Sequence, residues 1–411
     1  MKSQLLLAVA LFLAPSVWAQ SPSYPKAEWN PAKVILMHTP GEELFDGVIH
    51  PTAGLFEHYF DVDSAAKEHQ GYISMLEHNG IKVYRVTDIL NQLDIDTLRS
   101  LASQTLTYDV SQVNAADTAS CGEAYRQQML HQMTRADLIR CLLLQPTVKL
   151  KSVDNNTGLE ADYLHHSLMN LYFTRDQSIT TPRGHIICKM NSSQRLPETR
   201  ILRSCYYHLG LKPILEITGN GRLEGGDYIP AGNVSFIGRG MRTNTEAIEQ
   251  IMKADAFGHD TVAVVVDHKH WQMQMHLDTY FNIMDRNLCT MVSSRLNAKP
   301  GQPEYVTVDV YTRKPGTKEY RLSKKDVPFV SYLQKRGFTI IPINEADEMH
   351  YANNYLTIGP RHIMMVGGQS AELAAELQKH HVNVEWVPLE NLIKGYGAAH
   401  CMTQVLQRVA Q

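Results

Sequence analysis

Side chains able to do chemistry gather in five short segments of this sequence. Taken one at a time, each has an ordinary explanation: Asp176 suits a turn cap, Glu224 a solvated loop carboxylate, and Cys401 an inert buried thiol. Taken together, they supply a thiol, an imidazole and several carboxylates, which are the groups of nucleophilic and acid–base catalysis. The segments are residues 170–176 (NLYFTRD), 222–227 (RLEGGD), 240–244 (GMRTN), 276–278 (HLD) and 400–403 (HCMT).

A zinc centre is the sharpest alternative that the same residues offer. Asp267, His268 and His270 stand shortly before His276 and Asp278, and imidazole with carboxylate ligands suits zinc. However, the first two histidines follow the apolar run of residues 261–266, where alternate residues share one face of a strand whether or not a metal is bound. We therefore favour a thiol enzyme over a zinc hydrolase, and a chelator would distinguish the two.

Apolar hairpins recur along the chain and must position these segments. Two apolar strands about a polar turn occupy each of residues 171–189, 226–238, 277–292 and 354–366. Their recurrence at intervals of roughly 50 to 75 residues favours a radially repeated β/α architecture over unrelated hairpins.

The N-terminal part of the chain predicts an αβ unit, followed by a segment of different amino-acid composition. Residues 33–38 indicate a buried strand, residues 65–79 a helix that Gly80 ends, and residues 81–86 a second strand. From about residue 89 to 166, leucine, methionine, glutamine and acidic residues dominate. This composition predicts a mainly helical insertion.

Composition excludes several classes of function. The chain has 411 residues, 44% hydrophobic and 20% charged, which is ordinary for a globular protein with one large core or two linked ones. Its formal net charge is -3 and it has no long basic stretch, so a nucleic-acid partner is not expected. No segment approaches the roughly 20 apolar residues that a membrane helix needs.

The first nineteen residues predict export. Lys2 supplies a positive start, residues 5–14 an apolar run, and residues 17–19 (VWA) a small-x-small cleavage site; a buried N-terminal helix is the alternative. Residues 20–411 would then form the mature catalytic domain, periplasmic or secreted. Export permits disulfides, and Cys121 with Cys141 is a candidate pair, although spacing does not fix connectivity.

In their order, the reactive segments resemble those of arginine deiminases, which belong to the guanidino-group-modifying superfamily. The signatures are NLYFTRD at residues 170–176, EGGD at 224–227 and HLDT at 276–279, and the resemblance runs from Lys33 to Cys401. It implies an α/β propeller with pseudo-fivefold ββαβ-type repeats and a mainly helical insertion. It also implies hydrolysis of free L-arginine to citrulline and ammonia with no metal or cofactor. We expect a homo-oligomer.

The resemblance implies how these residues attack a guanidinium group. This cation is planar and resonance-stabilised, so attack at its carbon requires that it be held flat and its charge drawn to one side. Asp176 and Asp278 match the carboxylate pair that does this, and Cys401 matches the thiolate nucleophile. His276 would donate a proton to ammonia and later take one from water, and Glu224 would orient and charge it.

The resemblance also implies how the rest of the substrate is held. Arg242 and Arg195 match arginines that grip the substrate's carboxylate, although an ordinary surface arginine is the alternative for each. Asn170 would belong to the same end of the site, and Phe173 would lie along the face of the cation.

One departure leaves the exact substrate open. Arginine deiminases usually carry a further arginine five residues before the cysteine, whereas this chain has Tyr396. A tyrosine can donate a hydrogen bond but cannot neutralise a carboxylate. The alternatives are therefore agmatine, a peptidyl-arginine substrate, amidino transfer to an amine, and an arginine-binding protein without turnover. Arg195 and Arg242 argue against the peptide, which has no free carboxylate at that place.

Overall fold

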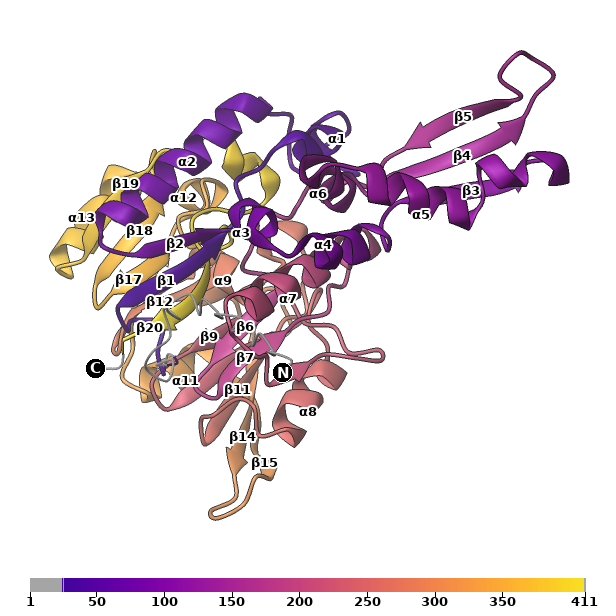
Figure 1. Cartoon of the computed structure of the whole chain (residues 1–411). Helices are drawn as coiled ribbons and strands as arrows, with labels where there is room; N and C mark the ends of the chain where they lie inside the picture. Colours follow the sequence, from indigo (N-terminus) through magenta and orange to yellow (C-terminus); the bar gives the residue numbers. More distant parts are fainter. Residues whose placement is uncertain (1–23, 25, 410–411) are drawn as a thin grey trace, which may run out of the picture.

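The computed structural model describes residue 24 and residues 26–409, so the expected signal peptide at residues 1–19 lies outside this part of the chain. Within it, the fold is mixed α/β (Figure 1). None of its helices combines the length and the apolar character needed to cross a membrane.

Five of the six sheets in the described residues repeat one pairing pattern. Two strands pair antiparallel, as a hairpin in four of the sheets, and a third strand pairs parallel to one of them. The sets are β6 (Ser178–Thr181), β7 (Gly184–Ile187) and β8 (Leu215–Glu216); β9 (Tyr228–Pro230), β10 (Val234–Arg239) and β11 (Thr261–Val266); β12 (Phe281–Asp285), β13 (Leu288–Val292) and β16 (Thr339–Ile343); β17 (Leu356–Gly359), β18 (His362–Val366) and β19 (Asn383–Val387); and β20 (Gln404–Arg408), β1 (Ala32–Met37) and β2 (Lys82–Arg85). The last set joins the two ends of the chain.

Helices make the crossovers that parallel pairing requires. They are α2 (Val62–His78) between β1 and β2, α7 (Glu198–His208) between β7 and β8, α8 (Thr245–Lys253) between β10 and β11, α10 (Ser293–Leu296) and α11 (Phe329–Lys335) between β13 and β16, and α13 (Ala371–Lys379) between β18 and β19. Two further strands, β14 (Thr307–Arg313) and β15 (Tyr320–Pro328), extend the second sheet. Short helices α1 (Phe45–Val48), α9 (Leu277–Tyr280) and α12 (Glu345–Met349) lie in the loops.

The predicted hairpins are confirmed, because each of the four apolar stretches falls on the antiparallel pair of one sheet. The predicted αβ unit is confirmed as well. Asp61 caps α2 by accepting a hydrogen bond from the Ser64 amide, and Gly80 follows the helix at a φ of 70°. A glycine adopts this left-handed conformation without steric strain, so the chain can turn directly into β2.

The expectation for residues 89–166 needs correction. Helices α3 (Val86–Gln92), α4 (Ile95–Ala102), α5 (Glu123–Gln132) and α6 (Arg135–Leu144) are present, but so is a sheet of β3 (Thr107–Gln112), β4 (Thr147–Ser152) and β5 (Leu159–Leu164). It projects from the rest of the molecule (Figure 1). The β3–β4 pair joins residues about forty positions apart, such as Thr107 and Thr147, so local composition does not predict it.

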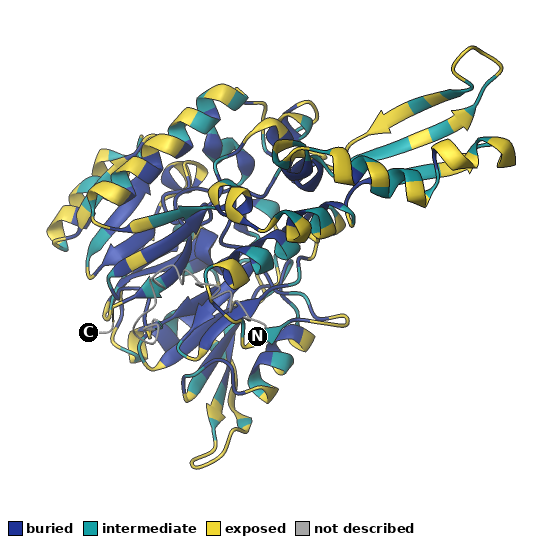
Figure 2. Cartoon of the chain, viewed as in Figure 1, coloured by how far each residue is buried: buried dark blue, intermediate teal, exposed yellow. Residues whose placement is uncertain are grey.

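Burial separates most of the hairpins from three of the third strands, although the third strand β11 is itself largely buried. Every residue of β6, β7, β9, β13 and β17 is buried, and the centre of the molecule is dark blue in Figure 2. The third strands β2, β8 and β19 are largely half-buried or exposed. The hairpins therefore form the inner part of the fold, where loops that enter them are held rigidly.

Candidate active site

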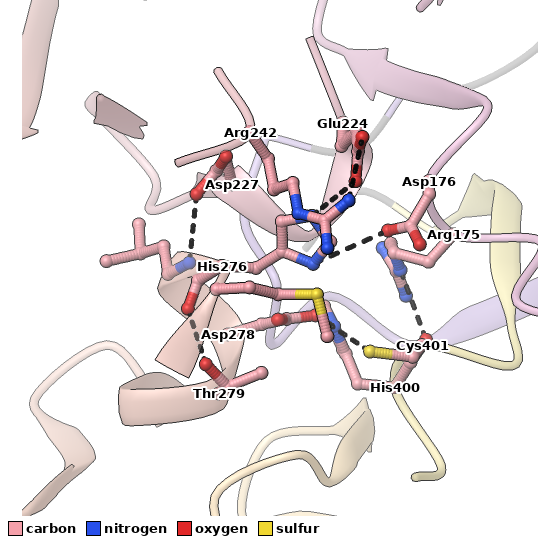
Figure 3. Close-up of polar contacts among 12 residues, drawn as sticks. Arg175, Asp176, Glu224, Asp227, Arg242, His276, Asp278, Thr279, His400 and Cys401 are labelled. Atoms are coloured by element: carbon pink, nitrogen blue, oxygen red, sulfur yellow. Dashed lines mark hydrogen bonds and ion pairs between the residues drawn. The ribbon is translucent and has the colours of Figure 1, made fainter. Parts of the chain in front are cut away.

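The predicted reactive residues stand at equivalent places in the fold, just before the first strand of a hairpin. Asp176 precedes β6, Glu224 precedes β9, His276 and Asp278 precede β12, and Cys401 precedes β20. The corresponding loop before β17 carries Asn354, which sequence reasoning missed. The repeated topology thus brings segments that are distant in the sequence to one buried site (Figure 3).

The thiol of Cys401 is buried next to a carboxylate. Its Sγ lies 3.7 Å from Oδ2 of Asp278, and only 3% of the residue is exposed. Burial raises the pKa of Cys401 well above its ordinary value, and the negative charges of Asp278 and Asp176 raise it further. The Cys401 side chain is therefore a neutral thiol until a positive charge comes close to it.

Backbone contacts fix the position of Cys401. Oδ1 of Asn354 accepts hydrogen bonds from the amides of Cys401 at 3.1 Å and Ala398 at 2.9 Å. The carbonyl of Cys401 in turn accepts from the Arg175 amide at 3.0 Å. In the sequence, Asn354 and Cys401 are separated by all the strands of the β17–β19 sheet, so only the folded structure reveals this contact.

Several buried polar atoms around the thiol have no hydrogen-bond partner among the described residues. They are Oδ1 of Asp278, Oδ1 of Asp176, Nδ1 of His276 and Nε of Arg242. The other oxygen of each carboxylate is held: Oδ2 of Asp278 accepts from Nδ1 of His400 at 2.6 Å. Because native proteins pair nearly all buried polar atoms, this concentration of unpaired atoms indicates a binding site for a polar ligand.

His276 is charged by the carboxylates around it. Its Nε2 donates to Oε2 of Glu224 at 2.9 Å, and its Nδ1 lies 3.7 Å from Oδ1 of Asp176. Burial alone would lower the pKa of His276, but the charge of Asp176 and the hydrogen bond to Glu224 raise it to about 9. His276 is therefore an imidazolium at neutral pH, ready to act as an acid.

Glu224 remains ionised although it is fully buried. Burial would raise its pKa, but the hydrogen bond from His276 and the charge of Arg242 bring it to about 2. The glycines that follow it are required by close contact. A Cβ on Gly225 would lie 1.9 Å from the Arg175 carbonyl oxygen, and one on Gly226 would lie 2.7 Å from Nδ1 of His276.

Asp227 connects the EGGD segment to the HLDT segment. Its Oδ1 accepts the Leu277 amide at 3.0 Å, which fixes the residue between His276 and Asp278. Burial raises the pKa of Asp227 to about 7, against the opposing charge of His276. The role of this aspartate is to position its neighbours, and sequence reasoning did not assign it one.

Arg195 already has partners within the protein. It is buried in the cavity wall, so it is not a surface arginine. However, its Nη1 lies 2.8 Å from Oδ2 of Asp176 and its Nη2 lies 3.0 Å from Oε2 of Glu198. Glu198, at the start of α7, supplies a counter-charge within the protein. Arg195 therefore does not stand as a free cation for a carboxylate, because two protein carboxylates already neutralise it.

The guanidinium of Arg242 still has a hydrogen-bond donor without a partner in the described residues. It lines the same cavity, donates to Oε1 of Gln272 at 2.9 Å and lies 3.8 Å from Oε1 of Glu224. Its buried Nε has no partner in the described part of the chain. Arg242 thus fits the expected role of a cation that binds the carboxylate end of a substrate.

The remaining predicted residues lie in the cavity wall with Cys401. Phe173 packs against Tyr172, with ring centroids 4.0 Å apart, and its ring would meet a Cβ on Gly397 at 2.6 Å. The side-chain amide of Asn170 donates to the Gly54 carbonyl at 2.9 Å, so it also holds a neighbouring loop. The lining is Leu55, Asn170, Phe173, Asp176, Arg195, Arg242, Gln272, Met275, His276, Gly395, Tyr396 and Cys401.

A buried line of charges behind Asp278 was not predicted. His400 reaches from Asp278 towards Glu28, with Nε2 at 3.5 Å from Oε1. Glu28 also pairs with Arg408. Glu28 and Arg408 come from opposite ends of the chain and meet because β1 pairs with β20, so no local pattern announces the contact.

The acidic groups near His276 could hold a metal, but they already have cationic partners within the protein. Asp176, Glu224 and His276 offer ligand atoms within 4.8 Å of one another. Arg195 and Arg242 already lie beside these carboxylates, so cations of the protein compete with a metal for them. His268 and His270, the basis of the zinc alternative, are exposed.

The cysteines are all free within the described residues. Sγ of Cys121 instead lies 3.1 Å from the Asp117 carbonyl, and Sγ of Cys141 lies 3.9 Å from the Met133 sulfur. The candidate Cys121–Cys141 disulfide is therefore not formed in this structure.

A larger cavity of about 430 Å³ lies elsewhere, against Trp29 and Phe338. Among the described residues that line it are Lys26, Arg286 and Arg336, but no cysteine, histidine or carboxylate. It therefore lacks the groups for nucleophilic chemistry, and the narrower cavity at Cys401 is the candidate active site.

Comparison with known sequences agrees with this assignment. Residues 53–408 match the model of the arginine deiminase family. An arginine deiminase of Halobacterium salinarum is 27% identical, with 94% of this chain and 96% of that protein aligned. One of Latilactobacillus sakei is 24% identical, with 94% and 99% aligned.

Solved structures share the fold at low identity. A dimethylarginine dimethylaminohydrolase mutant of Pseudomonas aeruginosa, complexed with citrulline, has a TM-score of 0.55 and 17% identity, covering 92% of this chain and all of that one. An amidinotransferase of Microseira wollei has a TM-score of 0.53 and 12% identity, covering 95% and 98%. At such identities the likeness concerns the fold alone.

Proposed function

The chain belongs to the arginine deiminase family, and from this premise we propose how the cavity at Cys401 hydrolyses free L-arginine to citrulline and ammonia. The observation that carries the proposal is the pair of unpartnered carboxylate oxygens on Asp278 and Asp176 beside the Cys401 sulfur. Two such acceptors suit the N–H fork of a guanidinium.

Binding of the substrate would activate the nucleophile. The guanidinium donates to Oδ1 of Asp278 and Oδ1 of Asp176, while Arg195 stays on Oδ2 of Asp176. The arriving cation offsets the two negative charges that keep the Cys401 thiol protonated. The thiol then releases its proton to solvent, and the thiolate faces the central carbon.

The first half of the reaction breaks a carbon–nitrogen bond. The Cys401 sulfur adds to the guanidinium carbon, and the electron pair of the C=N bond moves to nitrogen. The His276 imidazolium protonates one terminal nitrogen, which leaves as ammonia. The carbon remains bonded to Cys401 as an S-alkylthiouronium cation, and His276 is now neutral.

The second half restores the enzyme. Neutral His276 takes a proton from water while the oxygen adds to the thiouronium carbon. The carbon–sulfur bond then breaks, the thiolate of Cys401 leaves, and the carbonyl of citrulline forms with loss of the hydroxyl proton. The reaction balances as arginine and water giving citrulline and ammonia, and it requires no metal or cofactor.

The architecture that we propose for this function is a five-bladed α/β propeller. Its support is the repetition of one hairpin-plus-parallel-strand pattern in five sheets, each with a site residue before its first strand. The pairing of β20 with β1 would complete the last blade from the two ends of the chain.

We further propose that the protein is exported and forms a homo-oligomer. Export is supported by the pattern of residues 1–19, and N-terminal sequencing of the mature protein from cell fractions would test it. Light scattering on the purified protein would give the oligomeric state.

Substrate comparison tests the proposed function. Purified protein is offered L-arginine, agmatine and a blocked arginine peptide, and both the ureido product and ammonia are quantified. We expect equal amounts of citrulline and ammonia from L-arginine and none from the peptide. Amidino transfer to an added amine, without release of ureido product, would instead indicate an amidinotransferase.

A further inference from the structure

An acidic side chain stands where two cavity-lining segments meet. Leu55 and Tyr396 both line the cavity at Cys401. Between these segments the Glu57 amide donates to the Lys394 carbonyl at 2.7 Å. Glu57, two residues after Leu55, is therefore tied to the chain that carries Tyr396 and belongs to the rim of the active site.

The surroundings of this carboxylate are aromatic. Oε2 of Glu57 lies 3.5 Å from the hydroxyl oxygen of Tyr351, which is buried. Burial raises the pKa of Tyr351 well above its usual value, and the nearby charges of Glu57 and Cys401 add to this effect. Burial and Glu57 also raise the pKa of Tyr396. The carboxylate is thus close to the phenol groups of Tyr351 and Tyr396, and Tyr396 lines the cavity.

Glu57 has almost no counter-charge. Within the described residues its one ion-pair partner is His58, whose Nε2 lies 3.6 Å from Oε1 and whose side chain is 71% exposed. The resemblance to arginine deiminases implies an arginine at position 396, where this chain has a tyrosine. A partly buried carboxylate beside phenol hydroxyls, without a strong counter-charge, is an environment that recognises an ammonium group.

The opposite charge stands on another part of the same cavity. Arg242 lines it and has a buried Nε without a partner among the described residues. A basic group in the cavity wall and the Glu57 carboxylate, on a segment adjoining the lining residues Leu55 and Tyr396, therefore accompany the two aspartates beside Cys401. This arrangement complements a molecule that carries both an ammonium and a carboxylate at the end remote from its guanidinium.

We propose that Glu57, assisted by Tyr396 and Tyr351, binds the α-ammonium group of the substrate while Arg242 binds its carboxylate. This inference rests on the proposed arginine hydrolysis and extends it to the basis of substrate selection. It makes a free amine on the α-carbon a requirement for efficient turnover. Peptide-bound arginine, whose α-nitrogen is an uncharged amide, is excluded by the same contact.

Three substrates distinguish the ammonium contact of Glu57 from the carboxylate contact of Arg242. L-Arginine has both end groups, agmatine has the amine without the carboxylate, and 5-guanidinopentanoate has the carboxylate without the amine. The values of kcat/KM are measured for the unaltered protein, for Glu57→Gln and for Glu77→Gln, an exposed glutamate of α2 that serves as the matched control.

We expect Glu57→Gln to lower kcat/KM for L-arginine and agmatine about tenfold or more, mainly through KM, because a charge-assisted hydrogen bond is lost. For 5-guanidinopentanoate the change should be less than about twofold, because this substrate makes no such bond. Glu77→Gln should change none of the three. Ratios of kcat/KM between substrates do not depend on the folded fraction, so they remain informative if the variant is less stable.

An equal loss for all three substrates, or no loss for any, would overturn the ammonium site. In both cases the arginine hydrolysis itself would stand. Failure of the unaltered protein to release a ureido product from L-arginine would be a different result, because it would remove the proposed function and the ammonium site with it.

Discussion

The sulfur of Cys401 lies 3.7 Å from Oδ2 of Asp278, so the proposed nucleophile faces a negative charge that disfavours its thiolate. The same oxygen accepts from Nδ1 of His400 at 2.6 Å, and together with burial it keeps the thiol protonated. His276, the proposed proton-transfer group, is itself an imidazolium. Activation must therefore come from the charge of the substrate, and several consequences of this arrangement can be measured.

Asp278→Asn should make the thiol more acidic while it weakens catalysis. Removal of a negative charge beside the sulfur favours the thiolate, so alkylation of Cys401 by iodoacetamide should begin at lower pH than in the unaltered protein. Turnover of L-arginine should fall on the order of 100-fold or more, because the guanidinium loses one of its acceptors. An unchanged or higher pH midpoint for alkylation would contradict the assigned electrostatics.

Glu224→Gln should move the alkaline limb of the pH profile. His276 has a pKa raised to about 9, and the Glu224 hydrogen bond contributes to that rise. Without it the imidazolium is less stable, so the His276 pKa falls and the acid needed for ammonia release is lost at lower pH. The limb of kcat/KM that lies near pH 9 should therefore shift towards neutral pH. A limb that stays in place, or moves to higher pH, would show that another group controls it.

Arg195→Ala should destabilise the protein strongly. Its side chain is buried and neutralises Asp176 and Glu198, so the substitution leaves two buried carboxylates without their cation. We expect a loss of roughly 3–5 kcal/mol in the free energy of unfolding by urea. Arg140→Ala is the matched control, because Arg140 pairs with Glu42 at the exposed surface and its loss should change stability far less. Equal effects of the two substitutions would show that Arg195 contributes little to the buried network.

Removal of metal ions should leave the enzyme active. Arg195 and Arg242 already lie beside the carboxylates near His276, and the proposed reaction needs no Lewis acid. Dialysis against EDTA followed by assay with L-arginine should give an unchanged kcat, with a zinc protease treated in parallel as a positive control. Loss of activity that added zinc restores would revive the zinc alternative.

Much of the fold could be predicted because its elements are local. The hairpins of residues 171–189, 226–238, 277–292 and 354–366 show apolar strands about a polar turn, and all four were found in the structure. In the sheet of β3, β4 and β5, the β3–β4 pair spans a long separation, and the β4–β5 hairpin was missed because its strands are short and polar. Alternation such as that of Lys149, Leu150 and Lys151 is too short to distinguish a strand from a helix edge.

The site could be predicted where one segment carries both the residue and its role. The EGGD and HLDT segments placed Glu224, His276 and Asp278 together, and the structure joins Glu224 to His276 at 2.9 Å. Other contacts could not be predicted. Arg195 and Glu198 stand in one short stretch, but the sequence does not say which way their side chains point, so their ion pair was not foreseen. Asn354 meets Cys401 only through the fold.

The covalent intermediate on Cys401 is the central claim, and trapping it is the most direct measurement. The protein is mixed with excess L-arginine, quenched in acid during turnover, digested and analysed by mass spectrometry. We expect the peptide that contains Cys401 to carry the mass of arginine less ammonia, and Cys401→Ala to show neither the adduct nor citrulline formation. Citrulline formation by Cys401→Ala, or an adduct on any other residue of the unaltered protein, would contradict the account.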